Sequence, residues 1–317
     1  LKLSQDYNPK GMIITNRHGQ ILYNYHSKTT GDPASMTKLM TLYLTFDALD
    51  KGQIKKDQTI KMTEGDEKVS HLPNLSTFKL KKGQTYTVDE LMKQMTLASS
   101  NPATLILGRT IDGDTSKFTD RMNDKAKKTG MTHTHFTNPS GASNDLLKTY
   151  APKAYKDETK TTTTAQDMSL LVHRLLKRHP DVLKYTKLTH GEQYGQHFET
   201  TNLSLLGEAE AYPGTDGLKT GTSDEGYSLA LTNKQDSLRL NATLLDVKPY
   251  PSEQAKHVRN QIANHMIDHL RDEYVYKKVV SKGVHQIDGQ KVELKKALYD
   301  TVPKDKNKWH LKMNDQH

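Results

Sequence analysis

The sequence predicts an α+β fold: one antiparallel five-stranded sheet flanked by helices, with an all-helical subdomain inserted in the chain and a small C-terminal β domain. Three observations carry this prediction. Residues 11–25 hold two apolar runs joined by a Gly-containing turn, residues 216–247 alternate with period two, and the segment between them shows apolar residues at helical spacing. A hairpin and three late strands then form one sheet, and the helices form a separate layer.

The helical segment divides at recognisable start and stop signals. A helix is predicted over residues 35–51, with Gly52 as its stop. Two further helices meet at residues 99–102, and Thr87 is the expected cap of the first. An amphipathic helix follows and closes at Gly130.

The second half of the chain returns to the sheet. A loop-rich region is predicted over residues 131–163, followed by a helix over residues 165–179 and then the three strands. A long amphipathic helix over residues 252–271 completes the main unit, and we expect the first and last helices to cover the sheet. Two domains are therefore predicted, a main domain over residues 1–272 and a small β-rich domain over residues 273–317 that this chain carries only in part.

Composition limits the classes of partner. The formal charge is +9, from 46 Lys and Arg against 37 Asp and Glu. An ordinary basic surface explains this charge, and attraction to an anionic membrane surface or wall polymer is the functional alternative. Nucleic acid is not expected, because basic residues are spread along the chain without a nucleic-acid motif. The chain has no cysteine, as suits an exported protein, and neither end shows a signal or anchor, so we expect those segments to be missing from this chain.

The first chemical signal is the pair Ser35 and Lys38 at the start of a helix. Residues three apart project from one helix face, and a serine hydroxyl becomes a nucleophile when a neutral amine takes its proton. A serine cap beside a surface lysine is the plainer interpretation. The same spacing recurs at Ser76 and Lys79, so the pair alone does not identify a site.

Two further motifs favour Ser35 over Ser76. Ser99-x-Asn101 lies at a helix junction and Lys219-Thr220-Gly221 on a predicted strand. The set S-x-x-K, S-x-N and K-T-G is the signature of class A β-lactamases and penicillin-binding proteins. A second K-T-G at residues 128–130 is explained by a helix end capped by glycine.

Together with "TGMTHTHFTNPSG" and "AYPGTDGLKTGTSDEGYSLAL", these motifs make the chain resemble the low-molecular-mass penicillin-binding proteins, the serine D-alanyl-D-alanine carboxypeptidases, over most of residues 9–272. The resemblance implies a β-lactamase/transpeptidase-like fold without metal or cofactor. It implies peptidoglycan stem peptides ending in D-Ala-D-Ala as substrate and β-lactam antibiotics as covalent inhibitors. It also implies an extracytoplasmic location, at the outer face of the bacterial cytoplasmic membrane or in the cell wall.

The resemblance also implies the role of each site residue. Ser35 would attack the penultimate D-Ala carbonyl with Lys38 as general base, Ser99 would pass the proton to the leaving amine, and Asn101 would hold the substrate amide and orient Lys38. The implied catalytic residues are thus Ser35, Lys38, Ser99 and Asn101, and the implied substrate-binding residues are Lys219, Thr220, Gly221 and Thr222. Lys219 with Thr222 would bind the terminal carboxylate, and the backbone N–H groups of Ser35 and Thr222 would form the oxyanion hole.

Four other interpretations remain open at this point. The same site serves a D,D-transpeptidase, in which an amine instead of water takes the acyl group. A class A β-lactamase needs a glutamate in an E-x-x-L-N loop, and Glu158 in "KDETK" lacks that context. A non-catalytic wall-binding protein would not need all the acylation residues. A metal enzyme would rest on His265 and His269, without the zincin glutamate after the first histidine, and we assign these, with His133 and His135, to surface or packing roles.

Overall fold

A five-stranded antiparallel sheet in the order β2-β1-β11-β10-β9 organises the structure, a computed structural model that describes residues 7–313. The N-terminal strand β1 pairs with the late strand β11, with Ile13 opposite Thr243, so the two ends of the main unit meet in the sheet. The predicted hairpin and three late strands are confirmed. The strands are β1 Gly11–Asn16, β2 Ile21–Tyr25, β9 Thr215–Ser223, β10 Gly226–Gln235 and β11 Leu238–Val247.

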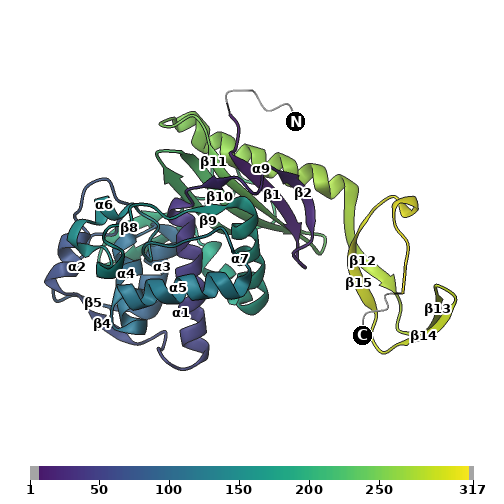
Figure 1. Cartoon of the computed structure of the whole chain (residues 1–317), viewed down its shortest axis with the longest axis horizontal. Coiled ribbons are helices and arrows are strands. Elements are labelled where there is room, and N and C mark those ends of the chain that lie inside the picture. Colours follow the sequence, from purple (N-terminus) through teal and green to yellow (C-terminus); the bar gives the residue numbers. More distant parts are fainter. Residues whose placement is uncertain (1–6, 314–317) are drawn as a thin grey trace.

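Helices cover both faces of this sheet (Figure 1). The long helix α9, Glu253–Glu273, packs its apolar side on one face, where Leu229, Leu244 and Ile262 share a buried cluster. On the other face α7, Ala165–Arg178, contacts β1 and β11. The expectation that the first helix covers the sheet is wrong for this face, because α7 takes that place and α1 packs mainly on other helices, among them α4 and α7.

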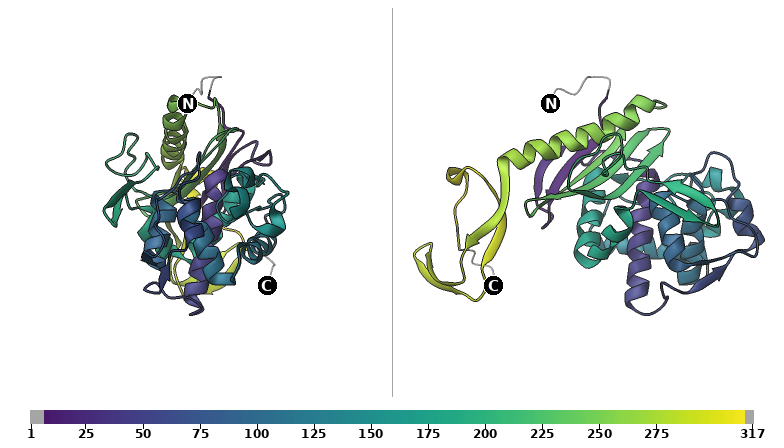
Figure 2. Two further views of the ribbon diagram at one scale, coloured as in Figure 1. Left: turned by 90° about the vertical axis from the view of Figure 1, so that its left-hand side faces the viewer. Right: turned by 180° about the vertical axis from the view of Figure 1, so that it is seen from behind.

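The helical lobe lies beyond that second face, on the side of the molecule away from α9 in two views (Figures 1 and 2). This lobe is mainly helical and also contains short strand pairs. One pair is β4 Thr59–Lys61 with β5 Thr85–Thr87. The hairpin of β7 His190–Gln193 and β8 Gln196–Glu199 lies beside it. A shorter pair joins β3 Thr30–Gly31 to β6 Thr163–Thr164. The helices are α1 Lys38–Asp50, α2 Glu64–Val69, α3 Val88–Leu97, α4 Asn101–Asp112, α5 Thr115–Thr129, α6 Asn144–Leu147 and α8 Leu183–Thr186.

Local capping chemistry sets these helix ends. Thr87 and Glu90 form a reciprocal capping box at α3, which satisfies two backbone N–H groups. Ser100 caps α4 through the N–H of Ala103. Gly130 ends α5 with φ of +85°, a left-handed conformation that glycine adopts without steric cost. The predicted cap at Thr87 and stop at Gly130 are therefore confirmed.

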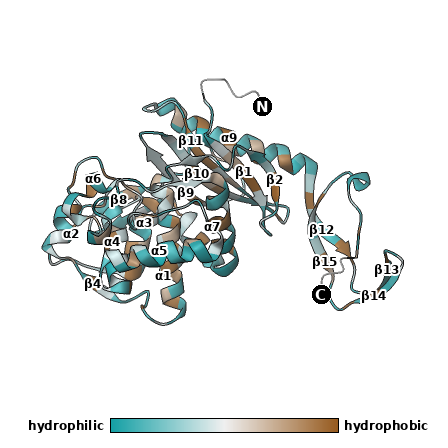
Figure 3. Cartoon of the chain, in the orientation of Figure 1, coloured by the Kyte–Doolittle hydropathy of each residue, from teal (hydrophilic) through white to brown (hydrophobic). Residues whose placement is uncertain are grey.

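The C-terminal residues form a separate small β unit at the far end of α9 (Figures 1 and 2). Its strands are β12 Tyr274–Val280, β13 Gly283–Ile287, β14 Gln290–Leu294 and β15 Leu298–Pro303. The β13–β14 hairpin is mostly hydrophilic, whereas hydrophobic colour recurs on β1, β2 and α1 (Figure 3). One contact to the main unit is the guanidinium of Arg17, which stacks 3.8 Å from the Tyr276 ring centre.

Within residues 7–313 no helix is both long and apolar enough to cross a membrane. The expectation that signal and anchor segments are missing concerns the chain ends, and residues 1–6 and 314–317 lie outside the described part.

Candidate active site

Ser35 lies on a tight turn that precedes α1. The sequence predicts an α-helix from this residue, but residues Ala34–Thr37 form a 3-10 helix and α1 begins only at Lys38. Ala34 has φ of +47°, and its N–H donates to Oδ1 of the buried Asp32 at 2.8 Å. This side-chain bond holds the backbone out of the α-helical course, so Ser35 stands at the end of α1 rather than on its side.

Lys38 lies directly beneath the serine. Its Nζ is 2.8 Å from Ser35 Oγ, and it also donates to Asn101 Oδ1 at 2.7 Å and to the Ser140 carbonyl at 2.9 Å. The side chain is 1% exposed. Burial, together with the charge of Lys219, holds the pKa of Lys38 well below its usual value.

Ser99 and Lys219 form a second pair on the opposite wall. Lys219 Nζ donates to Ser99 Oγ at 2.9 Å and to the Thr220 carbonyl at 3.1 Å, and both side chains are buried. Burial, with the charge of Arg259, lowers the pKa of Lys219 to about 7. Ser99 has φ of +53°, so the junction between α3 and α4 presents its side chain from a strained backbone.

Strand β9 forms the remaining wall, close against the turn that carries the serine. At Gly221 a Cβ would lie 2.5 Å from the Pro33 carbonyl oxygen and 3.1 Å from the Ser35 nitrogen, so only glycine fits. Thr220 is buried, and its Oγ1 is 2.6 Å from that of Thr201. A cavity of about 490 Å³ opens over this wall and is lined by Ser35, Asn101 and Thr222 among others.

Of the predicted site residues, the cavity is lined by Ser35, Asn101 and Thr222, and its lining does not include Lys38, Ser99, Lys219, Thr220 or Gly221. The decoy motifs do not repeat this arrangement. Ser76 lines the cavity, but it contributes its backbone carbonyl, which accepts bonds from the backbone N–H and the side-chain Nδ2 of Asn101. The second K-T-G forms the C-terminal end of α5. Glu158 is half exposed and pairs with His135 at 2.9 Å.

Three residues near the site, Ser140, Asp32 and Arg259, belong to none of the three predicted motifs. Ser140 enters through its carbonyl, which any residue type carries, so no signal marks it. Asp32 is buried beside the serine, and burial, together with the nearby Asp246, raises its pKa to about 7 against the lowering effect of its bond from Ala34. Arg259 is 3% exposed on the apolar side of α9. The sequence does contain a signal for Arg259, because a basic residue at helical spacing between the apolar residues Ala255 and Ile262 indicates a charge on the buried side of the helix.

The histidines of the helix pattern form no metal centre. Among residues 7–313, no group of three or more His, Asp or Glu side chains is arranged to hold a metal ion. His269 pairs instead with Glu273 at 3.2 Å on the exposed side of α9.

Comparison with known proteins identifies the family to which the chain belongs. Residues 6–249 match the family of D-alanyl-D-alanine carboxypeptidases. The chain belongs to this family. Residues 276–317 match a domain family of unknown function.

Relatives in the family include D-alanyl-D-alanine carboxypeptidase DacF of Bacillus subtilis, 31% identical over 83% of this chain and 62% of its own length. DacC of Escherichia coli is 29% identical over 75% of this chain and 56% of its own length. This chain therefore spans less than two thirds of the length of these carboxypeptidases.

Solved structures share the architecture. A peptidoglycan synthesis regulatory factor, PBP3 of Streptococcus pneumoniae, superposes with a TM-score of 0.84 at 24% identity, over 94% of this chain and 86% of that one. Penicillin-binding protein D2 of Listeria monocytogenes in its cefotaxime-bound form gives 0.68 at 25% identity, over 84% and 100%. The predicted α+β fold of the penicillin-binding proteins is confirmed.

Proposed function

We propose that this protein is a serine D-Ala-D-Ala carboxypeptidase that acts on peptidoglycan stem peptides through an acyl-enzyme on Ser35. The observation that carries the proposal is the set of three contacts at Lys38 Nζ. A neutral amine has two N–H groups and one lone pair. The carbonyl oxygens of Asn101 and Ser140 accept only, so they take the two N–H groups and leave the lone pair for the Ser35 hydroxyl.

The proposed acylation follows from this arrangement. Lys38 takes the proton of Ser35 as Oγ attacks the carbonyl of the penultimate D-Ala, and the oxyanion is held by the backbone N–H groups of Ser35 and Thr222. The C–N bond then breaks, and Ser99 relays the proton held by Lys38 to the leaving D-Ala amine, so that both side chains return to their starting state. Asn101 holds the substrate amide besides orienting Lys38. Water hydrolyses the ester and restores Ser35.

Lys219, Thr220, Gly221 and Thr222 form the proposed binding strand for the terminal D-Ala. A Lys219 cation faces the substrate carboxylate with help from the Thr222 hydroxyl, while Gly221 lets the peptide backbone approach the strand. A β-lactam presents its carboxylate and strained amide to the same groups. The cefotaxime-bound form of the Listeria protein supports binding of β-lactams by this chain, and covalent inhibition through Ser35 is part of the proposal.

A class A β-lactamase is the less favoured interpretation. Its water-activating glutamate has no counterpart in the described lining of the cavity, where the acidic residues are Asp32, Asp145 and Asp224. Glu158 is engaged with His135. Slow hydrolysis of a penicilloyl ester is therefore part of the proposal.

The remaining proposals concern the setting of the enzyme. We propose that residues 1–272 form the catalytic domain and residues 273–317 a small β domain, in line with the end of α9 at Glu273 and the start of β12 at Tyr274. We propose an extracytoplasmic location at the outer membrane face or wall, where the substrate is made. The net charge of +9 supports attraction to anionic membrane or wall polymers there.

Mass analysis of the products from a D-Ala-D-Ala pentapeptide tests this function. We expect a tetrapeptide and free D-Ala, with loss of both in Ser35→Ala. A cross-linked product upon addition of an amino acceptor would identify the transpeptidase alternative. No turnover of either kind, with intact binding, would favour the non-catalytic wall-binding protein.

A further inference from the structure

A second cavity, of about 450 Å³, lies at the other end of the sheet from Ser35. Lys234 and Arg239 face each other at the turn between β10 and β11, whereas Thr222 lies opposite Tyr227 at the far end of β10. The β1–β2 turn and the C-terminal part of α7 complete its walls. It is lined by Arg17, His18, His173, Lys177, Lys234 and Arg239, with Leu176, Pro180, Leu183 and Asn241.

The charge of this cavity is one-sided. Its lining contains two arginines, two lysines and two histidines but no carboxylate. Arg239 is neutralised by Asp216, which accepts two bonds of 2.8 and 2.9 Å. Arg17, Lys177 and Lys234 have no acidic partner in the part of the chain that the structure describes. Three cations without an acidic partner thus line one space, although Arg17 also stacks on the Tyr276 ring. They outweigh the partial negative charge of the α7 C-terminus.

One buried donor of the lining lacks an acceptor, and one accessible donor is free. Asn241 Oδ1 accepts a bond from Thr232 Oγ1 at 2.6 Å, while its Nδ2 makes no hydrogen bond among residues 7–313 and is not among the buried unpaired atoms. The Nε of Arg17 is buried without a partner, although its Nη2 donates to the Ser237 carbonyl. Buried donors normally find an acceptor, so an oxygen-rich ligand is the expected partner.

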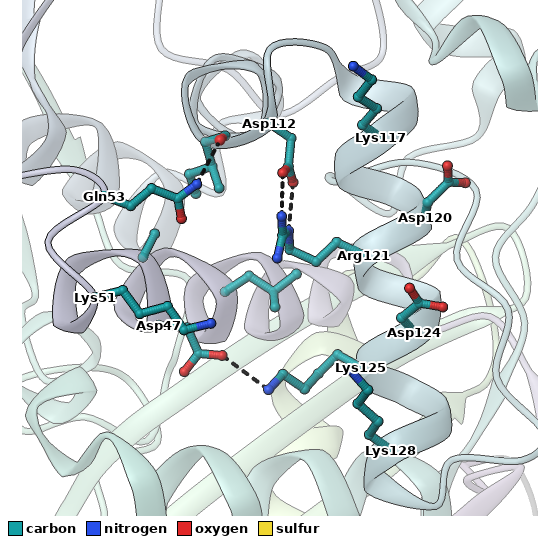
Figure 4. A pocket seen from close by; sticks show the side chains of 13 residues that line it. Asp47, Lys51, Gln53, Asp112, Lys117, Asp120, Arg121, Asp124, Lys125 and Lys128 are labelled. Atoms are coloured by element: carbon teal, nitrogen blue, oxygen red, sulfur yellow. Dashed lines mark hydrogen bonds and ion pairs between the residues drawn. The ribbon is translucent and has the colours of Figure 1, made fainter.

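Another charged cavity, which we call the mixed cavity, differs from this basic cavity in its balance of charge. It lies between α1, α4 and α5, measures about 400 Å³, and mixes both signs of charge (Figure 4). There Arg121 pairs with Asp112 at 2.6 Å and Lys125 with Asp47 at 3.1 Å. Carboxylates of the protein neutralise cations in that mixed cavity. The two cavities therefore differ in whether their cations have acidic partners, and not in whether lysines and arginines line them.

We propose that the basic cavity formed by Arg17, Lys177, Lys234 and Asn241 binds the phosphate group of an organic phosphate ester. A tetrahedral phosphate offers several acceptor oxygens to the guanidinium, ammonium and amide donors. The apolar wall of Leu176, Pro180 and Leu183 then packs against the carbon part of the ester, for which a volume of about 450 Å³ leaves room. This site does not depend on acylation at Ser35.

Calorimetric titration of the full chain with glycerol 3-phosphate tests the proposal. We expect saturable one-to-one binding that weakens about tenfold or more in the double variant Lys177→Gln, Lys234→Gln, because two cations near the phosphate are lost. The matched control is Lys117→Gln, Lys128→Gln, which removes the same charge from the mixed cavity and is expected to leave binding unchanged. Penicillin acylation of all variants should stay at the parental rate.

A second experiment distinguishes a lipid headgroup from a soluble ester as the source of the phosphate. It measures binding to vesicles of phosphatidylglycerol and of phosphatidylcholine. Sensitivity of phosphatidylglycerol binding to the cavity variant would identify a lipid headgroup as the source, and binding of soluble ester alone would identify a free ester. Equal loss of binding in both double variants would overturn the site, since net charge would then explain it. Succinate binding as tightly as the phosphate ester, or no saturable binding at all, would overturn it as well.

Discussion

The guanidinium of Arg259 lies behind the strand that carries Lys219, where its Nη1 donates to the carbonyl of Gly221 at 3.3 Å. The same nitrogen donates to the Ser228 carbonyl at 3.4 Å. Burial lowers the pKa of Arg259 to about 10, so the side chain is still a cation at neutral pH. Its charge adds to burial in holding the pKa of Lys219 near 7, which couples α9 to the proposed carboxylate site.

This coupling predicts a bell-shaped pH dependence of kcat/KM for a D-Ala-D-Ala peptide. The rate rises with pH as Lys38 loses its proton and falls above about pH 7 as Lys219 loses its charge. Removing the Arg259 cation raises the pKa of Lys219, so Arg259→Met should move the falling limb to higher pH. Arg271→Met, on the same helix but bonded to the carbonyls of Asn233 and Leu238, should leave that limb in place.

The nucleophile is tested by labelled penicillin and peptide mapping. Ser35→Ala should lose the label, because no other hydroxyl is 2.8 Å from Lys38 Nζ in the described residues. Ser76→Ala should keep it, since Ser76 serves Asn101 through its backbone carbonyl. An adduct mapped to Ser76 would contradict the assignment.

The two lysines should respond differently to replacement by arginine. Lys38 must be neutral to accept a proton, and a guanidinium stays charged, so Lys38→Arg should abolish acylation. Lys219 needs only a positive charge toward the carboxylate, so Lys219→Arg should keep measurable acylation with weaker substrate capture. Stopped-flow acylation rates separate the two, and similar rates for both variants would refute Lys38 as the base.

The penicilloyl ester should persist, because no glutamate is free to activate water in the described site. Intact-mass spectra over time should show the adduct long after free penicillin is removed, and Glu158→Gln should not change its lifetime. Rapid return to the free mass would restore the β-lactamase interpretation.

Gly141 is expected to be essential for the position of the Ser140 carbonyl. It has φ of +86°, and a Cβ there would overlap the carbonyl of Ala34. Gly141→Ala should therefore lower both the melting temperature and the acylation rate. Gly130 has φ of +85° in the left-handed region, and a Cβ there would meet only Leu170 at 3.9 Å, so Gly130→Ala should cost only about 1–2 kcal/mol of backbone strain and leave acylation intact. Equal acylation by the two variants would remove Gly141 from the site.

Much of the architecture follows from local patterns. Apolar spacing and backbone preference are properties of residues close together in the chain. They predict the strands, the cap at Thr87 and the end of α5 at Gly130 without knowledge of the tertiary structure. The three motifs are recognisable for the same reason. No local pattern predicts the 3-10 turn at Ser35, because it depends on Asp32 and on the close approach of β9.

The residue types that acylation needs, and the elements that carry them, can therefore be predicted from local sequence. Their pKa shifts and hydrogen-bond partners arise only when distant segments pack together. Burial and the charge of Lys219 from β9 lower the pKa of Lys38, while Asn101 and Ser140 from other segments accept its N–H groups. Arg259 reaches the site from α9 through the sheet. Desolvation and charge act through space between segments far apart in the chain, so no local pattern records them.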